Sequence, residues 1–162
     1  MYIGAKNNVF NSHVEFFSKM KKGTLYGLTP LVNETACGPD FYEEAKKSGH
    51  YIELDPAMSM EEAKEYANKM DVLYTDTWVD MEFFNNPAYQ KQKEETLAKM
   101  MPYQLNGDFT KDSKAIVFHD MPMHVGFEIS QDVVDKNLDH ILDEAENRRH
   151  AEKAVMYTLL NS

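Results

Sequence analysis

The sequence is poor in cysteine, glycine and proline, and each shortage excludes a class of protein. One cysteine, Cys37, stands among 162 residues, so an internal disulfide is impossible. Such cysteine usage fits the reducing cytoplasm, where we expect the protein to reside. The seven glycines and six prolines do not cluster, which excludes collagen-like, linker-like and low-complexity chains.

Long hydrophobic runs are also lacking. Apolar stretches such as residues 115–118 and 154–157 are far shorter than the ~20 residues that a membrane-spanning helix needs. The first eight residues contain no apolar segment of the kind found in secretory signals. We therefore expect no membrane span and no signal peptide.

Positive charge is the third shortage. The chain carries 17 lysines and arginines against 27 aspartates and glutamates, a formal net charge of −10. Such a surface repels phosphate backbones and anionic lipid headgroups, so neither a nucleic acid nor a membrane is an expected partner. The 43% hydrophobic content is typical of a soluble globular domain.

Short apolar runs alternate with amphipathic stretches along the whole chain, and the spacing predicts strands alternating with helices. Strands are expected at residues 2–3, 24–28, 51–54, 72–76, 115–119 and 141–142. Helices are expected at residues 9–22, 39–48, 59–70, 85–101, 130–136 and 144–160. This order predicts an α/β fold: one three-layer α/β/α sandwich over residues 1–162, with a mostly parallel, Rossmann-like sheet. The first strand resembles the end of a buried strand that has been cut short.

Polar residues follow three of the expected strands. Asn7 and Asn8 follow the first, Asp76 the fourth and His119 the fifth. Because ligands bind beyond the carboxyl ends of parallel strands, we expect these three places to converge on one site. Taken singly, the asparagines and Asp76 are equally consistent with helix caps, and His119 with an ordinary loop histidine.

Several common site motifs are missing. The segment 4–8 lacks the second and third glycines of a dinucleotide-binding turn, and the chain has no phosphate-binding P-loop. His119 and His124 lie five residues apart, which does not match a zinc-binding helix, and no serine nucleophile motif is found. We expect neither a cofactor nor a metal ion.

The polar clusters resemble those of a known family. The sequence is similar to the second, amino-acid-binding domain of aspartate and ornithine carbamoyltransferases, most of all to the ornithine branch. Five motifs occur in the family's order, and together they span nearly the whole chain: residues 4–12, 74–81, 102–106, 119–122 and 144–148. One departure is Ala5, where the family has aspartate.

The resemblance implies a role for each matching residue. Asn8, Asp76 and Met81 would contact the acceptor amino acid, as would His119, and Asp80 stands at an acceptor-binding serine position. Asp120 stands at the position of the family's catalytic cysteine. Met121 would present its backbone carbonyl to the carbamoyl group, and Arg148 would reach carbamoyl phosphate.

Two of these positions carry an unexpected negative charge. Asp80 and Asp120 replace serine and cysteine and, with Asp76, would bring three carboxyls together. One of them should then titrate at high pH. This pattern favours an acceptor more cationic than ornithine, such as a diamine. The alternative is a site that has decayed because catalysis is no longer under selection.

The family's first domain, which binds carbamoyl phosphate through a Ser-x-Arg-Thr-Arg motif, has no counterpart in this sequence. We therefore expect a carbamoyltransferase part that is incomplete alone and works with a complementary domain. The alternative is a non-catalytic, stand-alone module that binds a small molecule. Without the cover of the first domain, the apolar residues of segment 151–160 should cause self-association or an exchange of the last helix.

Overall fold

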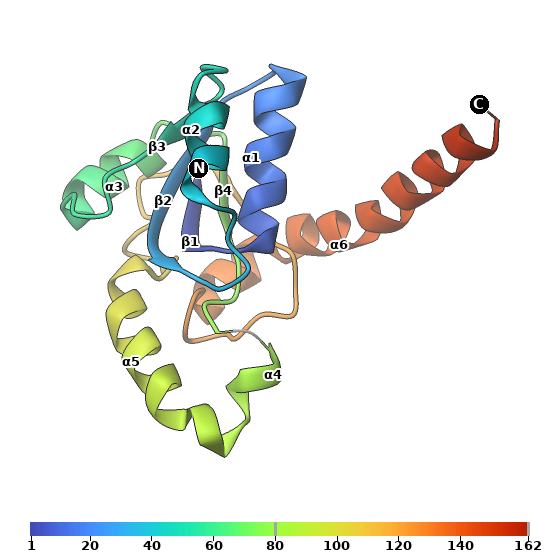
Figure 1. The fold of residues 1–162 in the computed structure, drawn as a ribbon. Coiled ribbons are helices and arrows are strands. Elements are labelled where there is room, and N and C mark those ends of the chain that lie inside the picture. The colour runs from blue at the N-terminus through green and yellow to red at the C-terminus, as the bar shows by residue number, and fades with distance from the viewer. Residues whose placement is uncertain (80, 162) are drawn as a thin grey trace.

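A computed structural model describes residues 1–79 and 81–161 and shows a parallel sheet at the centre of the protein (Figure 1). Its five strands lie in the order β3-β2-β1-β4-β5, and all neighbouring pairs are parallel. The strands are β1 (Tyr2–Lys6), β2 (Leu25–Val32), β3 (Tyr51–Glu53), β4 (Val72–Thr75) and β5 (Ile116–His119). The order reverses at β1, so the crevice between the ends of β1 and β4 is the expected place for a ligand.

Helices cover both faces of this sheet and confirm the three-layer α/β fold. On one face, α1 (Asn8–Met20) and α2 (Pro39–Lys46) enclose an aromatic cluster that includes Tyr2, Phe10 and Tyr42. On the other face, α3 (Met60–Ala67) and the first part of α6 (Gln131–Leu160) bury aliphatic side chains. The remaining helical segments are α4 (Met81–Phe84), η1 (Pro87–Tyr89), α5 (Gln90–Met100) and η2 (Met101–Tyr103).

Local sequence signals explain where several helices begin. Ser59 and Glu62 form a reciprocal capping box at the start of α3. Pro39 occupies the first turn of α2, where its missing N–H costs nothing. Asn7 caps α1 by accepting a hydrogen bond from the Phe10 N–H at 2.9 Å.

Strand β2 is longer than the sequence predicts. The expected strand stops at Leu28, before Thr29 and Pro30, whereas β2 continues through both residues to Val32. The pairing with β1 changes register here. Ile3 pairs with Leu28, but Ala5, two residues later, pairs with Leu31, three residues later. This irregularity accommodates a proline that has no N–H to donate to the ladder.

Two expectations from the sequence are wrong in the region of helix α6. The predicted strand at residues 141–142 is wrong, and the two helices predicted around it are one 30-residue helix. Val133, Val134 and Ile141 are buried, whereas Leu142 is exposed, which is the pattern of a helix with one apolar face. No glycine or proline interrupts residues 131–160, so nothing in the sequence ends the helix early.

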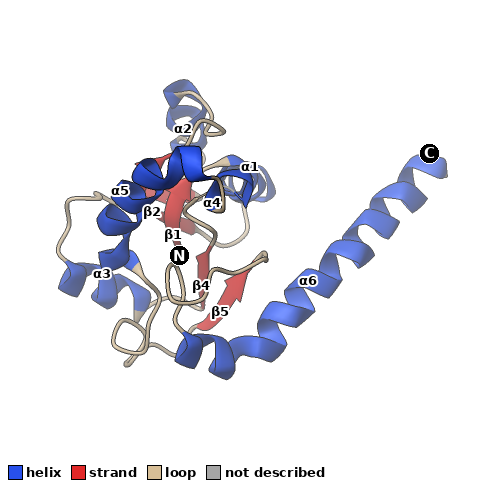
Figure 2. Cartoon of the chain, turned by 90° about the horizontal axis from the view of Figure 1, so that it is seen from below, coloured by secondary structure: helices blue, strands red, loops and turns tan. Residues whose placement is uncertain are grey.

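The second half of α6 projects away from the rest of the molecule. Figure 2 shows it running well beyond the sheet edge, and every described residue from 145 onward is exposed. The exposed side chains include Val155, Met156 and Tyr157, the last at 72% exposure. Across the residues that the structure describes, no helix is long and apolar enough to cross a membrane.

Candidate functional site

The carboxyl ends of β1, β4 and β5 bring three polar side chains together. Asn7 follows β1, Asp76 follows β4 and Asp120 follows β5. This convergence agrees with the expectation that the polar residues after these strands share one edge of the sheet. It also lies at the reversal of strand order, where loops leave β1 and β4 in opposite directions.

The Asp76 carboxylate is buried and fixed in orientation. Asn7 donates to Asp76 Oδ2 from its Nδ2 at 2.6 Å, while the Thr77 backbone N–H donates to Oδ1 at 2.6 Å. Asp76 is only 6% exposed. Because Asn7 also caps α1 with its Oδ1, its amide orientation is fixed at both ends. Acceptor contact was expected of Asn8, which is the exposed first residue of α1, beside the buried Asn7.

Asp120 adjoins Asp76, and the two carboxyls influence each other strongly. Burial raises the pKa of Asp120 to about 8, helped by the charge of Asp76, a hydrogen bond to it and the charge of Glu144. One titrating carboxyl of this kind was expected from the sequence. Among residues 1–79 and 81–161, no partner donates to the buried Oδ1 of Asp120. Near neutral pH this carboxyl therefore holds a proton that a nearby cation would displace.

His119 lies beneath the loop that follows β5 and holds it in place. Its ring is fully buried, with Nδ1 accepting the Met121 N–H at 3.1 Å and Nε2 3.2 Å from Glu128 Oε1. This pattern places the ring proton on Nε2, which donates to Glu128. The His124 N–H donates to the same glutamate oxygen at 2.5 Å. The geometry gives His119 a positioning role for Met121, whose φ of 51° is unusual for a residue with a side chain.

A third carboxyl, that of Glu144, reaches the cluster from α6, and it was not expected from the sequence. Tyr74 on β4 donates from its hydroxyl to Glu144 Oε1 at 2.6 Å. Burial raises the pKa of Glu144, opposed by hydrogen bonds from Tyr74 and the His119 backbone. His13 packs edge-on against Tyr74 with ring centroids 4.4 Å apart, and burial lowers its pKa to about 4. Glu144 opens the fifth family-like motif, which was the one sequence signal for it.

Three other residues were expected at the site from the sequence: Met81, Asp80 and Arg148. Met81 begins α4, the helix that follows the Asp76 loop, while Asp80 lies outside the described residues. Arg148 is not brought to the site: its side chain is 83% exposed on the projecting part of α6, where its Nε lies 3.0 Å from Glu152 Oε1. In the described part of the chain, no group of three His, Cys, Asp or Glu side chains could hold a metal ion.

Comparison with known proteins identifies relatives over nearly the whole chain. The model of the aspartate/ornithine carbamoyltransferase Asp/Orn-binding domain matches residues 1–159. The ornithine carbamoyltransferase of Chlorobaculum tepidum is 34% identical over 166 residues, covering 99% of this chain and 44% of that protein. The catabolic enzyme of Thermoplasma volcanium is 34% identical over 162 residues, covering 99% and 50%. This chain therefore spans about half the length of the curated relatives it matches.

Solved structures show the same relationship. The anabolic ornithine carbamoyltransferase of Campylobacter jejuni matches with a TM-score of 0.78 and 25% identity, over 99% of this chain and 50% of that one. The enzyme from Pyrococcus furiosus matches with a TM-score of 0.75 and 29% identity, over 96% and 47%. In both cases the likeness extends across one half of a longer chain.

Proposed function

This chain belongs to the aspartate/ornithine carbamoyltransferase family through its Asp/Orn-binding domain, and from that premise we propose that it binds the amine acceptor for carbamoyl transfer. The observation that carries the proposal is the adjoining pair of carboxyls, Asp76 and Asp120, where β4 and β5 end. Two carboxyls in a partly water-excluded place offer strong attraction to an ammonium group.

Each residue of the site has a proposed role in holding the acceptor. Asp76 binds the ammonium group, because Asn7 and Thr77 keep its carboxylate fixed. Asp120 faces the same group from β5. Asn8 would position the remainder of the acceptor from the start of α1, and Met81 would do so from the start of α4. Asp80, which lies outside the described residues, is proposed as a further acceptor contact. Met121 would present its backbone carbonyl, held in place through His119.

The proposed reaction needs positioning more than acid–base chemistry. The uncharged nitrogen of the acceptor attacks the carbonyl carbon of carbamoyl phosphate and forms the new C–N bond. The bond from that carbon to the phosphate oxygen breaks, phosphate leaves, and the nitrogen loses a proton. Holding both reactants in line supplies a large part of the rate enhancement. Carbamoyl phosphate would come from a complementary domain, with the exposed Arg148 as one contact for its phosphate.

A cationic acceptor should bind in preference to a zwitterionic one. We expect isothermal titration calorimetry at pH 7 to show tighter binding of putrescine than of ornithine, because the acidic pair repels the ornithine carboxylate. Binding should also release about one proton, since Asp120, with its pKa near 8, is protonated before the ammonium arrives. Titration in buffers of different ionisation enthalpy measures that proton.

The Asp120→Asn variant is the control for proton release, because an amide has no proton to lose in this range. We expect it to bind putrescine with no linked proton. Tighter binding of ornithine than putrescine would overturn the preference for a cation. If binding to Asp120→Asn still released a proton, the group that loses this proton would be a residue other than Asp120.

A stand-alone, non-catalytic binding module is the second candidate. It is favoured by Asp120 at the position of the family's catalytic cysteine and by Arg148 lying away from the cluster. Such a module would bind an amine with the same acidic pair but would never produce a carbamoylated product. Binding measurements alone therefore do not distinguish the catalytic domain from the non-catalytic module. Measuring turnover in the presence of a complementary domain distinguishes the two functions.

The chain should also associate with another chain through α6. Val155, Met156 and Tyr157 are more than half exposed on the part of α6 that projects beyond the sheet, where every described residue from 145 onward is exposed. Burying such side chains is favourable, and an unsupported helical segment of this length is marginally stable in water. Sedimentation velocity should show species heavier than 18.7 kDa.

The matched variants for association are Val155→Glu and Glu152→Ala, both on the same exposed stretch of α6. We expect Val155→Glu to shift the distribution toward the monomer and Glu152→Ala to leave it unchanged. A single monomeric boundary for the parent chain at all concentrations would rule out self-association.

A further inference from the structure

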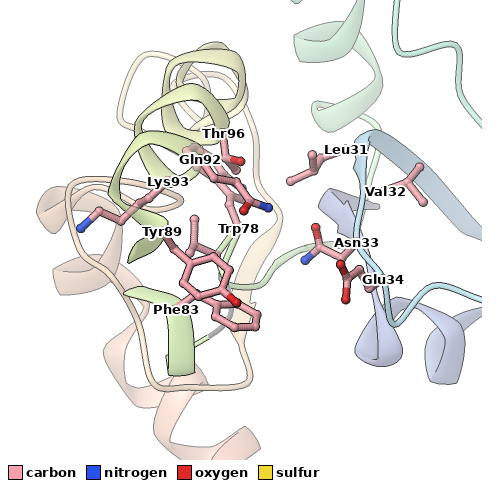
Figure 3. Close-up of a pocket in the computed structure, with 11 residues that line it drawn as sticks. Leu31, Val32, Asn33, Glu34, Trp78, Phe83, Tyr89, Gln92, Lys93 and Thr96 are labelled. Carbon is pink, nitrogen blue, oxygen red and sulfur yellow. The ribbon is translucent and has the colours of Figure 1, made fainter. Parts of the chain in front are cut away.

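A cavity of about 220 Å³ lies between the end of β2 and the segment that follows Asp76, and Figure 3 shows the side chains that line it. One wall is the end of β2 and the turn after it, and the other is formed by α4, η1 and α5. Neither Asp76 nor Asp120 is among its lining residues. The carboxyl pair of the proposed acceptor site is therefore not part of the described lining of this cavity.

Aromatic side chains form much of one wall. Trp78, Phe83 and Tyr89 all line the cavity, and the rings of Phe83 and Tyr89 have centroids 4.4 Å apart. Trp78 is only 1% exposed, so it backs the wall, and Phe83 and Tyr89 provide the ring surface that a guest can reach. The negative faces of aromatic rings attract cations.

The polar groups of the cavity are suited to a donor-rich, positively charged guest. Figure 3 shows the amides of Asn33 and Gln92 pointing toward one another across the cavity, with Glu34 on the same turn as Asn33. The amide and carboxylate oxygens can each accept a hydrogen bond.

Among the described residues that line the cavity, the one cationic side chain, that of Lys93, is directed elsewhere. Lys93 donates from its Nζ to the Phe84 carbonyl at 2.8 Å and lies 4.8 Å from the centroid of the Phe84 ring. In Figure 3 its ammonium group points away from the cavity. The charge that the described lining residues present to the interior is therefore that of Glu34.

We propose that this cavity binds a small organic ammonium compound, with its cation between the Glu34 carboxylate and the aromatic wall. The amide oxygens of Asn33 and Gln92 accept the N–H bonds. The volume equals that of about seven water molecules and lies below the ~300 Å³ of typical ligand pockets. A guest of a few heavy atoms, such as ethanolamine, fits this size.

The fluorescence of Trp78 provides a direct test, because it is the only tryptophan in the chain and lines the cavity. We expect ethanolamine to cause a saturable change in emission and ethylene glycol, an uncharged molecule of the same size, to cause none. Added salt should weaken ethanolamine binding, since Glu34 is exposed. Absence of saturable binding by ethanolamine, checked by calorimetry, would overturn the proposal.

Substitutions separate this cavity from the acceptor site. Glu34→Gln should weaken ethanolamine binding at least tenfold, and Gln92→Ala should weaken it too, while the exposed control Glu94→Gln on α5 should have no effect. Asp120→Asn should also leave ethanolamine binding intact. Binding that is lost in Asp120→Asn but kept in Glu34→Gln would assign the cation to the acceptor site and overturn the proposal. Glu34, Gln92 and Glu94 are exposed, so the variants at these three positions should fold like the parent chain.

Discussion

The Asp76→Asn variant will bind a cationic acceptor at least about 30-fold more weakly than the parent chain. Removing one charge of a buried charged contact costs about 2–5 kcal/mol, and 2 kcal/mol is a factor of about 30 in affinity. Asp76 is the better-fixed of the two carboxyls, because Asn7 and Thr77 hold both of its oxygens. Titration of the variant with putrescine measures the loss.

Asparagine keeps the shape of Asp76 but has a single acceptor oxygen, so either Asn7 or the Thr77 N–H loses its partner. That loss opposes folding, while removal of the Asp76 charge, which helps to raise the pKa of Asp120, favours it. We therefore expect far-UV circular dichroism like that of the parent. Asp139→Asn makes the same charge change at an exposed position of α6 and should bind putrescine normally. Unchanged affinity in Asp76→Asn would remove Asp76 from the acceptor site.

Replacing Asp120 with asparagine will stabilise the fold increasingly as the pH rises. The pKa of Asp120 is about 8 in the folded chain against an ordinary value of 3.8 for an aspartate, so between these pH values the folded state holds a proton that the unfolded state has lost. In that window each pH unit removes up to about 1.4 kcal/mol from folding stability. The Asp120 side chain is 29% exposed, and water screens part of this effect. We therefore expect the loss of folding stability from this group to total about 2 kcal/mol between pH 5 and pH 8.

The difference between variant and parent is the quantity to measure, because other groups titrate with the opposite sign. Burial lowers the pKa of His13 to about 4 and that of the Met1 amine to about 6, so both make the fold more stable as pH rises. Urea unfolding of parent and Asp120→Asn at several pH values gives the difference directly. The exposed control Asp139→Asn should follow the parent. A difference that does not change with pH would contradict the raised pKa of Asp120.

Short-range patterns in the sequence predict most of the fold. The capping residues Asn7 and Ser59 and the first-turn proline Pro39 each mark a helix start that the structure confirms. The failures come from tertiary context. Pro30 resembles a strand end, yet the change of register in β2 tolerates it. Ile141 and Leu142 resemble a short strand, yet only Ile141 is buried, because they lie on a helix.

The candidate site was predictable only in part, for the same reason. Asp76 and Asp120 meet because parallel strands end at one edge, a rule that needs no knowledge of side-chain contacts. Glu144 and His13 reach the same place across about 70 and 60 residues of sequence, through Tyr74. The spacing of apolar residues along the sequence does not indicate contacts between side chains so far apart in the chain. The distinction between the buried Asn7 and the exposed Asn8 likewise depends on which of the two caps α1.

The central claim is that this chain supplies the acceptor half of a carbamoyl transfer, and reconstitution tests it most directly. The chain would be mixed with the separately produced carbamoyl-phosphate-binding domain of a relative, such as the Chlorobaculum tepidum enzyme, and supplied with carbamoyl phosphate and either putrescine or ornithine. We predict a carbamoylated amine from the mixture, none from either half alone, and none from a mixture containing Asp76→Asn. No product with either amine, from a mixture in which the two halves demonstrably associate, would contradict the account and favour a non-catalytic binding module.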